Sequence, residues 1–591
     1  MLYFVLSVIY SLLSFGIMYW IGKEEKEDVK LGWIIGISLF IGGFFHFCNF
    51  AACSITTWYM PTAYIQVVVV AGISITIGWM MASGYNSEFF DNKACCYSTL
   101  GAVIIALGLL GSAVYSWDIF WAGHKQEMLS PKVVKAVKSD SIVAATDIHN
   151  LCVVPEAVAM RGINVKMGDL RNTYEVLSLT KQAATCDFVA TCSDGKKVHI
   201  KYDNHIIYVG LLEHKSFLTW WKQSYSPGYV IADASDEDKI YIVTEIDGEP
   251  LKIKYTNESY LFNNLERYVR NSGYANTILA DFDMEINEKG VPYAPITTMK
   301  NSIAMTTPVV TGVACVNLLN GEIKHYSPEN APAFVDLIYP MDVVYDRINW
   351  WGDYVYGYFH WTEKSGLTQA CEGMDVVVTP QGCFYYVGVR PQTDAVGTQG
   401  YMLVDTRTGK TTYYRRSGIS EAEAIRVLES NTDLNVEMQQ GVLSLSEPIF
   451  YNIEGLPTYF STYVSTKDNM VKYFGFCSTT DKSVWGYGKT LEEAKKSYLN
   501  SYYKNESNKN VKFADKQSLT VLEVELIEKT NINDVFYFKF KGHEDKVFVI
   551  SLSPECSDVL WTVPTGRKVK VSFNKTDNSK FVTLSSYEIM N

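Results

Sequence analysis

The sequence lacks the short motifs that identify common enzymes and metal sites. It contains no HExxH, GxSxG or EF-hand pattern, and no two of its nine histidines have ligand spacing on one predicted element. No basic stripe is present, because 64 acidic residues outnumber 52 basic ones and the formal net charge is −12. We therefore expect no enzyme activity, catalytic residue, metal, cofactor or nucleic-acid partner.

Signals for disulfide bonds are equally scarce. The twelve cysteines include no CxxC pair and no Cys/His spacing typical of a metal site. Cys186 and Cys192 could meet across a hairpin, as could Cys371 and Cys383, but isolated buried thiols are the favoured interpretation.

Apolar residues are concentrated near the N-terminus. Four stretches, each about 20 residues long, could cross ~30 Å of hydrocarbon as helices. They are Leu2 to Ile21, Leu31 to Ala52, Ala63 to Ala82 and Leu100 to Phe120. Residues 1–125 are therefore predicted to form a four-helix transmembrane domain in contact with membrane lipid.

Small and polar residues within these stretches suggest how the helices pack. Gly32 and Gly36 are spaced for close helix contact, and Gly108 and Gly111 lie close together in the fourth stretch. His46 and Asn49 are identified as the only strongly polar residues well inside a span, and they have no acidic partner. Such an isolated pair does not favour a proton relay or a transport pathway.

The distribution of lysines leaves the membrane orientation balanced. Lys23, Lys26, Lys30 and Lys93 lie on one side of the predicted spans, and Lys125, Lys132, Lys135 and Lys138 lie on the other. No basic side chain precedes the first span, and the first helix often dominates the topology. We expect both termini on one side, with the large domain outside the cytoplasm.

Beyond the spans, one pattern recurs about every 75 to 90 residues. A turn and an aromatic strand are followed by a strand, a tight turn and another strand. The aromatic strands begin at Asn204, Gly290, Gly382 and Gly455, and the second strands are Gly228 to Asp233, Gly312 to Asn317, Gly400 to Asp405 and, more weakly, Tyr473 to Ser478. The pattern predicts a juxtamembrane α+β domain at 126–225 and repeat units at 226–330, 331–430 and 431–508.

Helix caps complete at least two of these units. Ser420 to Glu423 and Thr490 to Glu493 both have the capping-box pattern ahead of an apolar helical face. Each unit should therefore be a small antiparallel sheet with one helix. Gly488-Lys-Thr490 is similar to the end of a P-loop, but Ser483 stands where a P-loop needs glycine, which argues against nucleotide binding.

The unit at 331–430 resembles the PepSY module. Tyr401 to Tyr414 and Ile419 to Ile425 carry the likeness over roughly 30 residues. The longer run from about residue 140 to 500 resembles an uncharacterised family of bacterial and phage membrane proteins, through Ser226-Pro-Gly-Tyr229 and Ile338-Tyr-Pro-Met-Asp342. The resemblance implies PepSY-like repeats and a cell-envelope location, and it supplies no catalytic residue.

The C-terminal region predicts a separate small domain. A polar linker at 504–510 precedes five short alternating strands, which favour an SH3-like or OB-like barrel at 515–591. The fold class expected for the whole chain is thus a multi-pass α-helical membrane segment, an α+β, β-rich array of PepSY-like repeats, and a small β-barrel.

A dense aromatic segment is the most unusual local feature. It contains Trp350, Trp351, Tyr354, Tyr356, Tyr358, Phe359 and Trp361. We expect it to form core between neighbouring units. The alternative is a binding surface made by Trp350, Trp351, Tyr354, Tyr358 and Trp361, because exposed aromatic side chains often anchor partners.

These patterns favour a non-catalytic, membrane-anchored binding or scaffolding protein, since repeated units provide long contact surfaces. Its expected partners are membrane lipid and other proteins or a second copy of itself. The alternative is a subunit of a larger membrane transport or secretion complex.

Overall fold

The structure is a computed structural model of the whole chain. It describes residues 2–24, 31–55, 61–83, 91–135, 151–303, 306–359, 366–379, 382–393, 397–415, 417–454, 456–510, 519–532, 535–550, 563–574 and 581–589.

Four N-terminal helices are long and apolar enough to span a membrane, which confirms that expectation. They are α1 (Leu2–Glu24), α2 (Leu31–Ala51), α3 (Pro61–Ser83) and α4 (Lys93–Tyr115). The fourth begins before the expected Leu100, because the Asn92 side chain caps it by accepting from the Cys95 N–H at 3.0 Å. The chain then breaks at Ser116 and starts α5 (Asp118–Glu127).

Two glycines allow close packing in the bundle, and neither belongs to the expected pairs. A Cβ added at Gly42 would lie 2.0 Å from Ser11 Oγ, and one at Gly78 would lie 3.2 Å from Met18 Cα. Gly32, Gly36, Gly108 and Gly111 have no neighbour within 4 Å of that position among the described residues, so they make no close helix contact within the chain. Spacing alone does not say which face of a helix meets a neighbour.

A polar contact also joins the spans. Asn49 on α2 exchanges hydrogen bonds with Gln66 on α3, at 2.7 and 3.1 Å, and the Tyr10 hydroxyl on α1 donates to Gln66 Oε1 at 3.0 Å. Gln66 is a further strongly polar residue well inside a span. The expectation that His46 and Asn49 were the only ones was therefore wrong. The pairing gives Asn49 a structural partner across the helix interface.

Four small sheets follow the spans. The first sheet comprises β3 (Thr180–Cys192), β4 (Lys197–Leu211), β6 (Tyr229–Asp233), β7 (Ile240–Ile246) and β8 (Glu249–Pro250). The second comprises β9 (Ile278–Ala280), β10 (Glu285–Ile286), β11 (Pro292–Ile303), β12 (Thr306–Asn317) and β13 (Ile323–Tyr326). The third comprises β1 (Lys132–Lys135), β14 (Thr368–Ala370), β15 (Asp375–Thr379), β16 (Gly382–Pro391), β17 (Gly400–Asp405) and β18 (Thr411–Arg415). The fourth comprises β19 (Leu443–Leu445), β20 (Ile449–Ile453), β21 (Leu456–Ser465), β22 (Val471–Ser478) and β23 (Trp485–Gly488).

Helices and one short strand pair accompany the sheets. They are α6 (Glu156–Lys166), α7 (Phe217–Lys222), α8 (Leu265–Val269), α9 (Met341–Asp353), α10 (Glu421–Glu429), α11 (Asn435–Gln439) and α12 (Leu491–Asn510), with β2 (Tyr174–Glu175) paired to β5 (Glu213–His214). The expected cap of α12 is present, since the Glu493 N–H donates to Thr490 Oγ1 at 3.2 Å. The linker expected at 504–510 is instead the last part of this helix.

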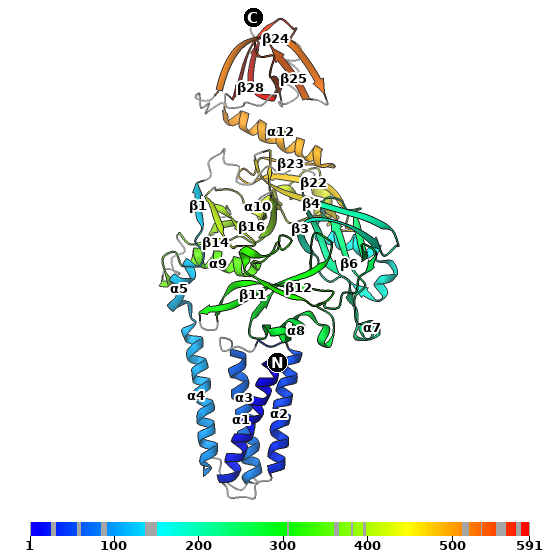
Figure 1. Cartoon of the computed structure of the whole chain (residues 1–591). Helices are drawn as coiled ribbons and strands as arrows, with labels where there is room; N and C mark the ends of the chain where they lie inside the picture. The colour runs from blue at the N-terminus through cyan, green and yellow to red at the C-terminus, as the bar shows by residue number, and fades with distance from the viewer. Residues whose placement is uncertain are drawn as a thin grey trace.

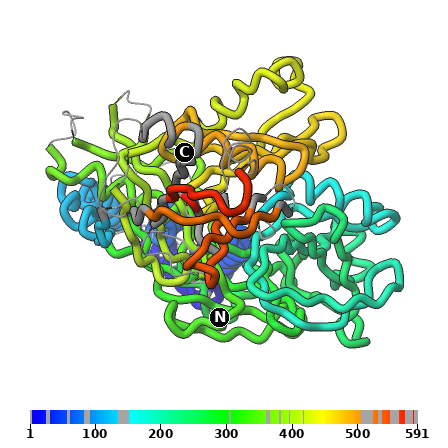
Figure 2. The backbone as a smooth tube through the Cα atoms, turned by 90° about the horizontal axis from the view of Figure 1, so that it is seen from above, coloured from blue at the N-terminus to red at the C-terminus, as the bar shows by residue number. Residues whose placement is uncertain are grey.

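The four sheets pack in a closed ring. One apolar core joins the first sheet to the second, and two smaller cores around α9 continue from the second to the third. Another core joins the third sheet to the fourth, and a further one joins the fourth back to the first. Figure 2 shows the chain running round this ring from cyan through green to yellow, above the blue helices. Closure buries the two outer faces that an open array would expose.

Each of the four sheets contains a similar hairpin turn, in which the backbone bond spans five residues at Asn317 and Asp405 and six at Asp233 and Ser478. In each, one backbone N–H donates across the hairpin at 2.9 Å: Asp233 to Lys239, Asn317 to Glu322, Asp405 to Lys410 and Ser478 to Val484. The side chain of that first residue also accepts from the N–H two positions later, at 2.8 to 3.2 Å. Short polar side chains are favoured here because they complete the turn's hydrogen bonding.

Two polar contacts attach the ring to the spans (Figure 1). On one side, Arg267 of α8 donates through Nε to the Phe50 carbonyl at 2.9 Å and through Nη2 to the Ala51 carbonyl at 3.2 Å. These carbonyls lie in the last turn of α2, where no helical partner remains. On the other side, Asp118 of α5 pairs with Lys125 at 2.6 Å and accepts from the Tyr354 hydroxyl. The chain then adds β1 to the third sheet, parallel to β18.

The last domain is a small closed barrel, as expected. Its strands are β24 (Leu519–Ile532), β25 (Val535–Phe540), β26 (Val547–Ile550), β27 (Lys568–Asn574) and β28 (Phe581–Ile589), in the order β24-β25-β26-β28-β27. The pair β26–β28 is parallel. Figure 1 places this barrel beyond α12, at the end farthest from the spans.

The described cysteines are all free thiols. Cys186, Cys371 and Cys383 are buried and Cys192 is half-buried, so neither proposed hairpin pair is bonded.

Candidate functional site

Strands of the first, third and fourth sheets, together with the β9–β10 connection of the second, line one partly open cavity of about 580 Å³. The first sheet contributes Thr180, Lys181 and Tyr208, and the start of α6 contributes Glu156. The other sheets and their connections contribute Asp283, Met341, Met374, Asp375, Ser446, Glu447 and Ile449. A volume in this range is typical of sites for small molecules and side chains.

One ion pair crosses this cavity. Lys181 Nζ lies 2.9 Å from both carboxylate oxygens of Asp375 and joins the first sheet to the third. Burial lowers the pKa of Lys181, but the Asp375 charge and hydrogen bond outweigh it, so the net pKa is raised. The ammonium therefore stays protonated, and the Asp375 carboxylate balances its charge.

Three further carboxylates line the cavity without such a partner. Within the described residues, no salt bridge joins Glu156, Asp283 or Glu447 to a cation. Removal from water by the surrounding protein raises the pKa of Asp283, and the nearby Glu156 charge raises it further. All three carboxylates are exposed, so the cavity presents an excess of negative charge to solvent that could attract a cation.

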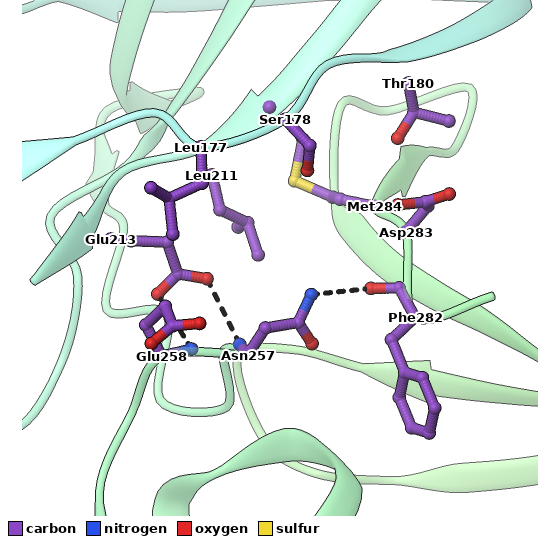
Figure 3. Close-up of a pocket in the computed structure, with 11 residues that line it drawn as sticks. Leu177, Ser178, Thr180, Leu211, Glu213, Asn257, Glu258, Phe282, Asp283 and Met284 are labelled. Carbon is purple, nitrogen blue, oxygen red and sulfur yellow. Dashed lines mark hydrogen bonds between the residues drawn. The ribbon is translucent and has the colours of Figure 1, made fainter. Parts of the chain in front are cut away.

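A smaller pocket of about 150 Å³ adjoins the cavity and shares Thr180 and Asp283 with it (Figure 3). On its opposite wall Glu213 accepts hydrogen bonds from Thr256 Oγ1 at 2.5 Å and from the Asn257 N–H at 3.1 Å. Burial nevertheless raises the pKa of Glu213 to about 7, against the lowering effect of these bonds. Asn257 Nδ2 donates to the Phe282 carbonyl at 3.1 Å and so holds the segment that carries Asp283.

The thiol in the cavity is not an activated nucleophile. Cys152 Sγ lies 3.4 Å from the Tyr208 hydroxyl, which itself donates to the Val154 carbonyl at 2.9 Å. Burial raises the pKa of Cys152, so the reactive thiolate is disfavoured.

One serine, histidine and aspartate do meet outside the cavity, but not as a catalytic relay. Asp233 Oδ1 lies 2.7 Å from His205 Nε2 and 2.7 Å from Ser235 Oγ. Ser235 also approaches the same Nε2, at 3.4 Å. A relay needs the two ring nitrogens to contact different partners. Among the described residues no group of three or more His, Cys, Asp or Glu could hold a metal ion.

The aromatic segment lies where the ring meets α5. Lys125 Nζ sits 4.5 Å above the Trp350 ring, and Trp351 packs edge-on against Tyr413 at 5.4 Å. Tyr354 and Tyr358 line a second cavity, of about 610 Å³, together with Trp117 and Asp118. Tyr356 and Phe359 are exposed. Trp361 lies outside the described residues.

Sequence reasoning did not single out most of the cavity residues. No local sequence motif marks Glu156, Lys181, Asp283 or Asp375. Lys181 and Asp375 are 194 positions apart, and no local spacing signals such a pair.

Comparisons with known proteins identify no family. No family model and no curated protein matches the chain. Among solved structures, a levansucrase variant from B. megaterium aligns with 77% of this chain and 99% of its own length, at 7% identity and a TM-score of 0.18. That TM-score is too low to indicate a shared fold.

Replacing Trp351 tests whether the aromatic segment is part of the core or forms a binding surface. Trp351→Ala should destabilise the chain by about 2–3 kcal/mol, less than a fully buried tryptophan, because the ring is half-buried against Tyr413. Phe359→Ala should change stability by less than about 0.5 kcal/mol, because that ring is 75% exposed. Thermal unfolding of the purified chain measures both, and equal stability of the two variants would contradict a core role for Trp351.

The free energy of unfolding should decrease as the pH rises from about 5 to 8. Burial raises the pKa values of Glu213, Asp336 and Glu421 to about 7, above the ~4 expected for unfolded carboxyls. Between these values the folded state holds more protons, so raising the pH favours unfolding by up to about 1.4 kcal/mol per pH unit for each group. The unfolding temperature should therefore rise as the pH falls from 8 to 5. Glu213→Gln should flatten this rise, and an unchanged slope in that variant would contradict the assignment.

Proposed function

We propose that this chain is a non-catalytic, membrane-anchored binding protein whose ligand occupies the cavity between the sheets. The main support is that the cavity, lined by three sheets and by the connection that carries Asp283, holds four carboxylates and a single ammonium, which is already paired. A thiol held neutral and the lack of a catalytic relay at His205 support binding over chemistry.

The lining favours a cationic ligand with an apolar stem, such as an arginine or lysine side chain of a peptide. Glu156, Asp283 and Glu447 offer negative charge, while Met341 and Met374 offer adaptable apolar surface. Arginine suits such a site because its planar guanidinium can bond to two carboxylates at once.

We further infer that the four sheets are variants of one PepSY-like unit. The support is a similar turn in each sheet, of five or six residues, with a side-chain acceptor at the corresponding residues Asp233, Asn317, Asp405 and Ser478. For the terminal domain, strand order β24-β25-β26-β28-β27 with a parallel β26–β28 pair favours the OB-like alternative. A place in the cell envelope fits both inferences.

Binding of triarginine to the detergent-solubilised full chain tests the ligand class. Asp283→Asn should weaken binding about tenfold, which corresponds to ~1.4 kcal/mol, because one unpaired carboxylate is lost. Glu437→Gln removes the same charge from exposed α11 and should leave the affinity unchanged. Titration calorimetry measures both variants. Equal weakening by the two variants would indicate a long-range charge effect, and absence of binding by the unmodified chain would refute the cationic ligand.

We propose that the ring lies outside the cytoplasm, because the lysines that flank the spans are balanced and long domains are translocated largely regardless of charge. Val436→Cys on the ring should react with a membrane-impermeant maleimide on intact cells, because that side chain is 64% exposed. Asp91→Cys, next to the start of α4, should react only after permeabilisation. The reverse labelling pattern, relative to the unmodified chain, would place the ring in the cytoplasm.

A further inference from the structure

An exposed apolar patch lies on the face of the ring that points toward the spans. On α7, Phe217, Leu218 and Trp221 are 42%, 71% and 67% exposed. Next to them, in the short turn before α8, Leu261 and Phe262 are 46% and 69% exposed. Contiguous exposed apolar side chains of this size usually mark a contact with a partner or a membrane.

This patch, residues 217–221 with 261–262, is continuous with the end of α2. The Phe262 ring lies 5.2 Å from the Phe50 ring in the last turn of that span. Arg267 covers the same turn and bonds to the Phe50 and Ala51 carbonyls. The patch therefore lies at the level where a membrane-spanning helix ends and the lipid headgroups begin.

The two halves of the patch are fixed to each other. Asn263 Nδ2 donates to the Ser224 carbonyl at 3.0 Å, and the Phe217 and Tyr260 rings pack at 5.2 Å. Leu261 is held at a φ of +54°, a conformation that leucine rarely adopts, while its carbonyl accepts from Arg267 Nη1 at 2.7 Å. This arrangement keeps Leu261 and Phe262 on the surface instead of letting them fold into the core.

Within the patch, the 261–262 turn adjoins the end of α2, whereas α7 lies to the side of the helix bundle. Figure 1 shows α7 at the height of α8 but displaced sideways from α1–α3. Figure 2 also shows this part of the chain extending past the blue helices. The surface under α7 is consequently lipid.

We propose that α7 and the 261–262 turn insert into the lipid–water interface of the membrane that α1–α4 cross. Tryptophan and phenylalanine on one face of a short helix, with Lys222 at its end, suit this interface, because the rings enter the acyl boundary and the ammonium reaches the headgroups. Trp220 turns inward and is 6% exposed, so α7 has one face for the protein and one for lipid. The insertion gives the ring a lipid contact away from the spans and restricts its tilt.

Lipid-depth quenching tests this contact in the full chain reconstituted into vesicles. An environment-sensitive fluorescent amino acid replaces Leu218 in one variant and Val436 in a matched control, since both side chains are exposed, at 71% and 64%. With lipids brominated near the headgroup, emission from position 218 should fall at least threefold, and emission from position 436 should be unchanged.

Equal quenching at the two positions would overturn the proposal. So would loss of quenching at position 218 as protein density in the vesicles rises at constant lipid composition, because a second copy of the chain would then cover the patch and exclude lipid. Adding Trp221→Asp and Phe262→Asp to the variant labelled at 218 should abolish its quenching. Both side chains are mostly exposed, so an unaltered unfolding temperature is expected and separates loss of insertion from loss of fold.

Discussion

Contact between the first and fourth sheets is the constraint on which the rest of the soluble structure depends. It is made by a shared apolar core that includes Tyr208, Val230, Tyr451 and Phe460. A hydrogen bond from the Cys152 N–H to the Tyr451 hydroxyl, at 3.0 Å, crosses the same boundary between residues 299 positions apart. Each sheet alone is too small to bury both faces, and only closure removes the two ends from water. The cavity exists because the ring is closed.

Closure also explains the electrostatics of the interior. Bringing the sheets together places carboxyls from different sheets near one another, and Glu156, Asp283 and Glu447 line the cavity as exposed side chains. Lys181 and Asp375 compensate each other there. Asp336 and Glu285 instead share a buried position in which burial raises both pKa values. The ring therefore carries potential negative charge that a cationic ligand could stabilise, which is the physical basis of the proposed binding function.

The membrane sets the orientation of this ring. Arg267 at the end of α2 and the Asp118–Lys125–Tyr354 contact at α5 lie at separate points on its lower face. A proposed lipid contact at α7 would add another. With several attachment points the ring cannot rotate freely about one linker, so its cavity keeps a defined direction relative to the bilayer. The aromatic segment around Trp350 contributes to this attachment through the contacts of Trp350 with Lys125 and of Tyr354 with Asp118, while Trp351 packs against the core of the third sheet.

The sequence by itself determined the features that depend on neighbouring residues. The length of the apolar stretches predicted the spans, and the alternation of apolar and polar residues predicted the strands and the barrel. The position of Thr490 before an apolar helical face predicted a helix cap. Each of these features reflects hydrogen bonding or burial within one segment. Only the tertiary structure decided that Gly42, and not Gly36, contacts a neighbouring helix and that Gln66 pairs with Asn49. It also decided that the four sheets close into a ring. It alone assembled Glu156, Lys181, Asp283 and Asp375 into one cavity. The reason is that these contacts join residues far apart in the chain, and their geometry follows from how whole sheets and helices pack.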